Sequence, residues 1–387
     1  MKDKKQNKII AWLAAAHFTT DIYSGFLNPI MPFIATKIGI SMGIAALLMS
    51  ISQLFSQLLQ PIFGFFADSI FKRGFIFWGL LFSAIFFPFS SSANNVWSLA
   101  LFIILGSLGV SIFHPQGIGF VIRFTKEDFT KNMGIFLSMG SIGYAFGPMI
   151  SASVTHYFGL EKIPFTAIPG IILALLMFAC VPKISNIDKK PEKKNIFDVF
   201  KAILSNTQIK ILILIAIMKA VISSSCAILL PFLWKDYGHD AFYIGTALFA
   251  FMLAGGIGSL VSPKFEKWLG TKCIIYVSML SMPVLMAIFV FTYKIIPTFA
   301  LIDFVLMAFI LMLATPITMV LAQKELPQYK SIIGGFLNGF CWGIVGVLLS
   351  GMGFMAQKYG VLQILFVAGI LPAFCAYFVK YLKVDNN

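Results

Sequence analysis

Two ionisable side chains, His17 and Asp21, interrupt a largely apolar run of the chain from Ala11 to Pro32. They are four residues apart, so a helix would place them on one face. An unpaired carboxylate at the centre of a bilayer costs roughly 2.5–3.5 kcal/mol on insertion scales, so such a residue normally faces protein or water. The pair is therefore the first candidate for a functional site.

Two further ionisable residues, His114 and Lys219, fall inside other apolar runs. At 1.5 Å per residue, His17 and His114 both lie about 12 Å from the inner ends of their runs. By the same measure Lys219 lies about 15 Å in and Asp21 about 18 Å in. Three runs thus carry ionisable groups in one layer near the midplane of the membrane. The sequence gives this common depth, but not whether the side chains face one another.

Asp21 is the best candidate for a proton carrier. A low-dielectric environment favours the protonated form of a carboxyl group, whereas a nearby cation favours the carboxylate. If Asp21 met Lys219 in one conformation and lost it in another, it would bind and release a proton in each cycle, as proton-driven antiport requires. The structural alternative is a static ion pair between the two residues that holds the halves of the protein together.

Histidine side chains titrate near neutral pH, so His17 and His114 suit a proton relay or a contact with substrate. The alternative is that each histidine satisfies a local hydrogen bond. A metal centre is disfavoured, because the sequence shows no third ligand at a suitable spacing. The five cysteines have neither metal-ligand nor redox spacing. We therefore expect no metal, and no cofactor other than a proton gradient as the energy source.

The composition is that of an integral membrane protein. Hydrophobic residues make up 59% of the 387 residues and charged residues 11%, against about 25% charged residues in soluble domains. Twelve apolar runs recur along the chain, each near the roughly 20 residues that span a hydrocarbon core. Because they lack the alternation of barrel strands, we predict helices. Their approximate ranges are 9–34, 44–66, 75–92, 96–122, 132–157, 163–182, 209–234, 241–262, 273–293, 297–322, 331–356 and 361–379.

The net charge of +14 is explained by membrane topology. If the N-terminus lies inside, most of the 29 Lys and Arg residues fall in segments that face the same side. The positive-inside rule then places both termini in the cytoplasm. The basic balance needs no nucleic acid to explain it, and we expect no nucleic-acid partner.

One substantial polar linker, 183–208, divides the predicted helices into six and six. We therefore predict an N-terminal six-helix bundle at 1–182 and a C-terminal six-helix bundle at 209–387. Within the linker, the segment 196–204 is either an amphipathic helix on the inner surface or part of a solvated tether.

An internal repeat supports this division into halves. Four identities recur at an offset of 200 residues, in the fifth and the eleventh predicted helices. Repeated halves are common in transporters, with the substrate site between them. The matching residues are Gly134, Phe136, Leu137 and Gly143 in the first half and Gly334, Phe336, Leu337 and Gly343 in the second.

The loop after the second predicted helix carries a motif that runs from Gly64 through Asp68 to Lys72 and Arg73. It resembles the GxxxD(R/K)xG(R/K)(R/K) loop of the major facilitator superfamily. The resemblance implies that Asp68 and the two cations tie the halves together on the cytoplasmic side when the cavity opens outward. It also implies that predicted helices 1, 4, 7 and 10 line a central cavity.

The fifth predicted helix carries Gly143, Gly147 and Pro148, which resemble the GxxxGP signature of exporters in that superfamily. Two glycines and a proline permit close helix approach and a bend, so we assign them to the conformational gate. Plain packing between helices is the alternative.

Within the superfamily the chain is most similar to the fosmidomycin-resistance-type efflux proteins. The similarity covers nearly all of residues 1–380. Two positions depart from the family pattern: Gln116 replaces an acid and Gly119 replaces a base. These departures argue against a phosphonate-like anion as the substrate. The residues that carry the similarity are His17, Asp21, Leu59-Gln60-Pro61, Gly64, Asp68, Phe113-His114-Pro115, Lys219, Ala322-Gln323 and Leu326-Pro327.

Five polar or aromatic residues are candidates for binding the substrate. Lys219 is too far from either end of its helix to snorkel, so it either pairs with the acid of the first helix or binds an acidic group of the substrate. Gln53 lies on a polar stripe, for which hydrogen bonding between helices is the alternative. For Asn338 and Trp342, one helical turn apart, packing is the alternative. The full set is Lys219, Gln116, Gln53, Asn338 and Trp342.

These observations together predict an all-α membrane protein with twelve transmembrane helices in two six-helix pseudo-repeats. We expect a secondary active transporter that moves a small organic molecule outward by alternating access, in exchange for protons. Proton-coupled uptake by the same residues is the alternative. An intramembrane enzyme lacks a nucleophile or a metal cage here, and a membrane receptor would bind ligand regardless of a proton gradient. We expect a monomer in the bacterial inner membrane.

Overall fold

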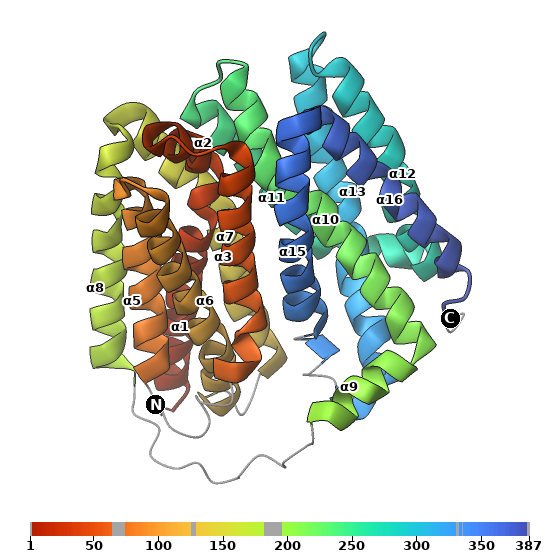
Figure 1. Ribbon diagram of the computed structural model, residues 1–387. Helices are drawn as coiled ribbons and strands as arrows, with labels where there is room; N and C mark the ends of the chain where they lie inside the picture. Colours follow the sequence, from red (N-terminus) through yellow and green to blue (C-terminus); the bar gives the residue numbers. More distant parts are fainter. Residues whose placement is uncertain are drawn as a thin grey trace. The chain divides into compact units, whose positions relative to one another are not determined.

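The computed structural model describes residues 2–63, 74–124, 129–181, 196–329, 333–334 and 336–384. This described part is helical and contains no strand (Figure 1). Its main elements are α1 (Lys2–Gly25), α2 (Leu27–Ile38), α3 (Met42–Leu58), α5 (Gly74–Phe89), α6 (Val96–Phe124), α7 (Phe129–Phe158), η2 (Leu160–Thr166), α8 (Ala167–Cys180), α9 (Ile196–Ser205), α10 (Thr207–Asp236), α11 (Ala241–Leu269), α12 (Thr271–Thr292), α13 (Pro297–Glu325), η4 (Phe336–Phe340), α15 (Cys341–Tyr359) and α16 (Val361–Val379).

The helices follow the predicted apolar runs and confirm the all-α membrane fold. Nine helices in the described ranges are long and apolar enough to cross a bilayer by length and composition. The third run forms α5, which is only 16 residues long. Three runs are each divided between two consecutive elements of the fold, α1 with α2, η2 with α8 and η4 with α15. Counted in this way, the elements are consistent with twelve membrane-crossing segments.

The first run is broken, although the sequence predicts one continuous helix there. The chain bends at Phe26, between α1 and α2. Pro29 has no backbone N–H to donate to Gly25, and its ring would collide with the carbonyl group of that residue. The proline therefore explains why the helical hydrogen bonds of α1 end at Gly25.

The chain divides into two compact units, which are described separately. The first unit comprises Met1–Lys189 together with Pro231–Phe249, and the second comprises Lys190–Leu230 together with Ala250–Asn387. Helices α10 and α11 are thus divided between the units along their lengths. The first unit holds the last turns of α10 and the first turns of α11.

In the first unit, α1 packs chiefly against α7, and α5 packs chiefly against α6. Large side chains from four of these elements form one apolar core, in which Leu13, Phe113 and Phe136 are fully buried. Burying apolar side chains of this size contributes about 1.5–3 kcal/mol each in water, but in a bilayer the contribution comes from close packing instead.

Glycines set the close contact between α1 and α7. A Cβ atom at Gly143 would collide with the carbonyl oxygen of Phe18, and one at Gly147 would collide with the carbonyl oxygen of Ile22. Only a residue without a side chain allows the two helix backbones to approach this closely. Both glycines thus have a packing role, and Pro148 lies inside the same helix, α7.

In the second unit, α12 packs against α13 and α16. Hydroxyl groups join neighbouring helices there: Ser278 Oγ donates to Ile310 O at 2.7 Å, and Ser262 Oγ donates to Leu313 O at 2.7 Å. These bonds satisfy polar groups that would otherwise lie unpaired in an apolar interior.

The linker segment Ile196–Ser205 forms the helix α9. Its Ile203 side chain is fully buried, and the Phe200 ring contacts the rings of Phe336 and Phe340 at centroid distances of 5.5 and 5.9 Å. This segment is thus a helix and not an unstructured tether, and its apolar side chains pack on other residues of the second unit.

Candidate functional site

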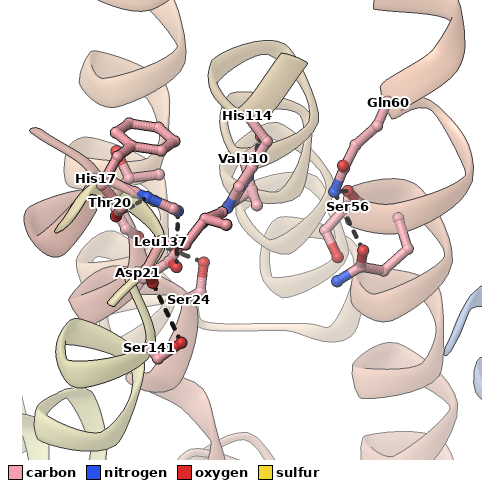
Figure 2. A network of polar contacts seen from close by, with 12 residues as sticks. His17, Thr20, Asp21, Ser24, Ser56, Gln60, Val110, His114, Leu137 and Ser141 are labelled. Atoms are coloured by element: carbon pink, nitrogen blue, oxygen red, sulfur yellow. Dashed lines mark hydrogen bonds and ion pairs between the residues drawn. The ribbon is translucent and has the colours of Figure 1, made fainter. Parts of the chain in front are cut away.

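Three ionisable side chains of the first unit meet at one point (Figure 2). His17 and Asp21 come from α1, and His114 comes from α6. The Nε2 atom of His17 lies 3.3 Å from Asp21 Oδ2, and the Nε2 atom of His114 lies 3.2 Å from Asp21 Oδ1. Each carboxylate oxygen thus faces one histidine. We call these three residues the His–Asp–His cluster.

Backbone carbonyl groups fix the orientation of both imidazole rings. The Nδ1 atom of His17 lies 2.8 Å from Phe136 O, and that of His114 lies 2.9 Å from Val110 O. A carbonyl oxygen can only accept, so Nδ1 must carry a hydrogen in both rings. The other ring nitrogen, Nε2, is therefore the one that faces Asp21.

This orientation makes the cluster a site for protons. When both Nε2 atoms and the carboxylate are unprotonated, two lone pairs point at a negative charge and repel it. Each contact between Nε2 and a carboxylate oxygen becomes favourable when one proton lies in it. With both contacts made, the cluster holds two protons more than its fully deprotonated form.

The three side chains of the cluster differ in their exposure. The His17 side chain is 5% exposed, and it stacks on the Phe136 ring at a centroid distance of 4.1 Å. The side chains of Asp21 and His114 are 14% and 19% exposed. Asp21 and His114 are therefore the more accessible members of the cluster.

The three side chains also form a possible set of metal donors. Their ligand atoms all lie within 4.8 Å of one another. The sequence does not reveal this set of three donors, because the distance between α1, which carries His17 and Asp21, and α6, which carries His114, cannot be read from it. The expected absence of a metal stays a prediction, and a chelator provides its test.

Lys219 lies in the second unit, near the middle of α10. It is 5% exposed, and its Nζ atom donates to Thr315 Oγ1 of α13 at 2.7 Å. A cavity of about 70 Å³ adjoins it. The predicted substrate residue Trp342 also lines this cavity.

The other predicted substrate residues lie elsewhere in the fold. Gln116 is 4% exposed, on the same helix as His114 and two residues after it. Gln53 is half-buried on α3. Just beyond the end of α3, the side-chain amide of Gln60 donates to Ser56 O at 2.9 Å, so this bond stays within one stretch of the chain and does not join two helices. Asn338 is in η4, and its side chain lies outside the described set.

The predicted loop motif lies outside the described residues. It comprises Gly64, Asp68, Lys72 and Arg73. Its role as a conformational gate stays a prediction.

Sequence reasoning missed several residues that complete the two polar sites. Thr315 is the hydroxyl partner of Lys219, and the Phe136 and Val110 carbonyl groups orient the histidines. A threonine in an apolar run gives no distinctive signal, because it usually bonds to its own helix backbone. Gly140 was missed as well: a Cβ atom there would lie 2.8 Å from Asp21 Oδ2.

Comparison with known proteins places this geometry in a family. The profile of the Major Facilitator Superfamily matches residues 13–350. The fosmidomycin resistance protein of Escherichia coli (strain K12) is 21% identical over 377 residues, which cover 94% of this chain and 90% of that protein. The multidrug resistance protein MdtG of Serratia proteamaculans (strain 568) is 24% identical over 273 residues, which cover 68% of this chain and 65% of that protein.

Solved structures show the same fold at low sequence identity. A bacterial homologue of the human lysosomal transporter Spinster, in an inward-facing and unoccupied conformation, superposes with a TM-score of 0.79 and 14% identity, over 98% of this chain and 97% of its own. The nucleoside transporter NupG superposes with a TM-score of 0.74 and 13% identity, over 97% and 98% of the two chains. Since the family profile covers most of the sequence, this chain belongs to the Major Facilitator Superfamily of membrane transporters.

Proposed function

We propose that the protein exports a small organic molecule in exchange for protons. The observation that carries the proposal is the His–Asp–His cluster, in which Asp21 is held between two histidines of fixed orientation. Ionisable groups inside a membrane helix bundle are costly, and a cluster of three of them is therefore a candidate for function. In the proposed cycle, the cluster binds protons in one conformation and releases them in the other.

Two relatives support export as the direction of transport. They are named for resistance to fosmidomycin and to multiple drugs, and export of a toxic compound is the usual basis of resistance by a transporter. The alternative is uptake, for which the fold neighbour NupG, a nucleoside transporter, is an example. We place the protein in the bacterial inner membrane, as a monomer with both termini in the cytoplasm.

Asp21→Asn tests proton coupling. The amide keeps the shape of the side chain but cannot exchange a proton, so we expect active transport to fall at least tenfold while membrane insertion stays normal. Everted vesicles with an acidic lumen provide the measurement, with a panel of labelled antibiotics and organic acids as probes and radiolabelled fosmidomycin as the phosphonate comparison. Accumulation of a probe in the lumen means export in cells, whereas expulsion from the lumen means uptake.

Asp303→Asn is the matched control for this variant. Asp303 is also a buried carboxyl group, 5% exposed, and lies in α13 of the second unit. The same chemical change there should leave the proton-driven transport of the probe unchanged.

Transport by Asp21→Asn against a gradient would disprove the coupling role. If EDTA abolished transport by the wild type and zinc restored it, the His–Asp–His cluster would be a metal site rather than a proton-binding site.

A further inference from the structure

The ammonium group of Lys219 uses one of its hydrogen-bond donors on a described partner. It donates to Thr315 Oγ1 at 2.7 Å, and the Thr315 hydroxyl in turn lies 3.5 Å from Met312 Sδ. A lysine ammonium carries three N–H groups. Two donors therefore remain for another acceptor.

The described residues of the second unit offer Lys219 no negatively charged partner. Among the described residues of the second unit, no carboxylate oxygen lies within 4.0 Å of its Nζ atom. The side chain cannot extend to the aqueous phase, because it starts near the middle of the 30-residue helix α10. A buried lysine of this kind stays protonated only when an anion or several dipoles compensate its charge.

The cavity beside Lys219 is lined by this lysine, two threonines and five apolar side chains. Thr315 and Thr318 contribute hydroxyl groups, of which Thr318 Oγ1 already donates to Ala314 O at 2.9 Å. The rest of the lining is apolar and consists of Ala216, Met312, Met319, Leu337 and Trp342. A volume of about 70 Å³ suits an acid group and the first part of its carbon skeleton rather than a whole drug-sized molecule.

We propose that Lys219 and Thr315 bind the acid group of a singly charged organic anion, whose aromatic or aliphatic body lies along Met312, Met319 and Trp342. One ammonium compensates one negative charge, so a monoanionic carboxylate matches the site better than a doubly charged phosphonate. Methionine and tryptophan side chains provide a polarisable surface for an apolar body of variable shape. The inference rests on the proposed transport function, because it names the class of substrate for the same protein.

Equilibrium binding to the purified, detergent-solubilised protein tests the inference without a proton gradient. The probes are 4-nitrobenzoate, its uncharged isostere 4-nitrobenzamide, and 4-nitrophenylphosphonate, which is mostly a dianion at pH 8. Nitroaromatic groups quench tryptophan fluorescence on contact, and Trp342 lines the cavity. We expect saturable quenching by 4-nitrobenzoate, at least tenfold tighter than by the amide and several-fold tighter than by the phosphonate. Trp342→Phe should remove this quenching.

Three variants separate the outcomes. Lys219→Met should weaken 4-nitrobenzoate binding at least tenfold, whereas Lys219→Arg, which keeps a cation, should retain most of it. Asp21→Asn should bind like the wild type, so a failure of proton coupling with intact acid binding counts against the proposed function only. Equal binding of acid and amide, equal binding by Lys219→Met, or the absence of saturable quenching by all probes would each overturn the inference.

Discussion

At the scale of single residues, the site depends on how α7 meets the His–Asp–His cluster. Gly140 of α7 faces His17 and Asp21, and a Cβ atom at this position would lie 2.8 Å from Asp21 Oδ2 and closer still to His17 Nε2. Phe136, one turn earlier on α7, supplies the carbonyl group that holds the His17 ring. One stretch of α7 thus both orients a histidine and leaves room for its contact with the acid.

Gly140→Ala should damage the cluster through a single methyl group. The methyl group would force the His17 ring or the Asp21 carboxylate away from their contact, and crowding in a packed interior typically costs about 1–3 kcal/mol. We expect at least tenfold slower proton-driven transport, with a lower midpoint of thermal unfolding. Transport in everted vesicles and unfolding in detergent measure the two effects.

Gly134→Ala is the control on the same helix. An added Cβ atom at Gly134 meets nothing within 4 Å, so this variant should transport like the wild type and unfold at the same or a slightly higher temperature. If both alanine variants behave alike, the contact of Gly140 with the cluster has no functional importance.

The sequence predicts part of this site and leaves the rest open for a geometric reason. The spacing of His17 and Asp21 fixes their contact, because residues i and i+4 are neighbours on any helix. His114 could be assigned only a depth, since the rotation of one helix relative to another depends on packing. The partner of Lys219 was open for the same reason, and the structure supplies Thr315 in its own unit.

At the scale of the elements, the packing of α5 on α6 determines where His114 points. Gly109 of α6 lies against α5, and a Cβ atom there would be 2.7 Å from Gly79 O and 2.9 Å from Phe82 Cβ. Gly79 of α5 in turn contacts the backbone of Phe113, the residue before His114. The two glycines therefore set the distance and rotation of the helix that carries the histidine.

Gly109→Ala should separate α5 from α6. Because the methyl group would meet backbone atoms, which cannot rotate away, we expect destabilisation of about 1–3 kcal/mol and a lower midpoint of thermal unfolding in detergent. Gly119→Ala in the same helix meets nothing within 4 Å and serves as the control. It should be neutral or slightly stabilising, since alanine favours a helix over glycine by about 1 kcal/mol. Equal unfolding midpoints for the two variants would contradict the packing argument.

Element boundaries were predictable where hydrophobicity alone decides them. Apolar length indicated helices in the right order, including the short third one. The break between α1 and α2 was not predicted, although Pro29 and Pro32 were visible in the sequence. Prolines also lie inside α6, α7 and α10 without a break, so the tertiary surroundings decide which proline interrupts a membrane helix.

At the scale of the whole molecule, alternating access requires contacts that form and break. The segment Pro231–Phe249, which joins α10 to α11, belongs to the first unit. There, His156 Nδ1 at the end of α7 lies 3.1 Å from Asp240 Oδ2, and the Phe242 ring contacts the His156 ring at 5.8 Å. The backbone N–H of Tyr243 binds the other oxygen of Asp240 at 2.8 Å, which fixes the carboxylate at the start of α11.

The contact between His156 and Asp240 is weak enough to form and break during transport. The side chains of His156 and Asp240 are 35% and 52% exposed, and exposed ion pairs contribute only about 0–1 kcal/mol. Beside them, a Cβ atom at Gly245 would collide with the Ala152 side chain, so α7 and α11 meet through small residues. Because the ion pair is weak and the residues beside it are small, this contact between α7 and α11 can open and close without a large energetic barrier.

Linking α7 to α11 at this contact should stop the transport cycle. We consider His156→Cys with Asp240→Cys, in a chain whose exposed Cys180 and Cys273 are replaced by serine. A short bis-methanethiosulfonate reagent would join the two new thiols and hold the contact closed. If the two helices must separate in each cycle, transport of a labelled probe into everted vesicles should fall at least tenfold and recover when a reductant cleaves the link.

Each single-cysteine variant should keep its activity under the same treatment. Full transport by linked protein would show that this contact persists throughout the cycle and that the moving surfaces lie elsewhere.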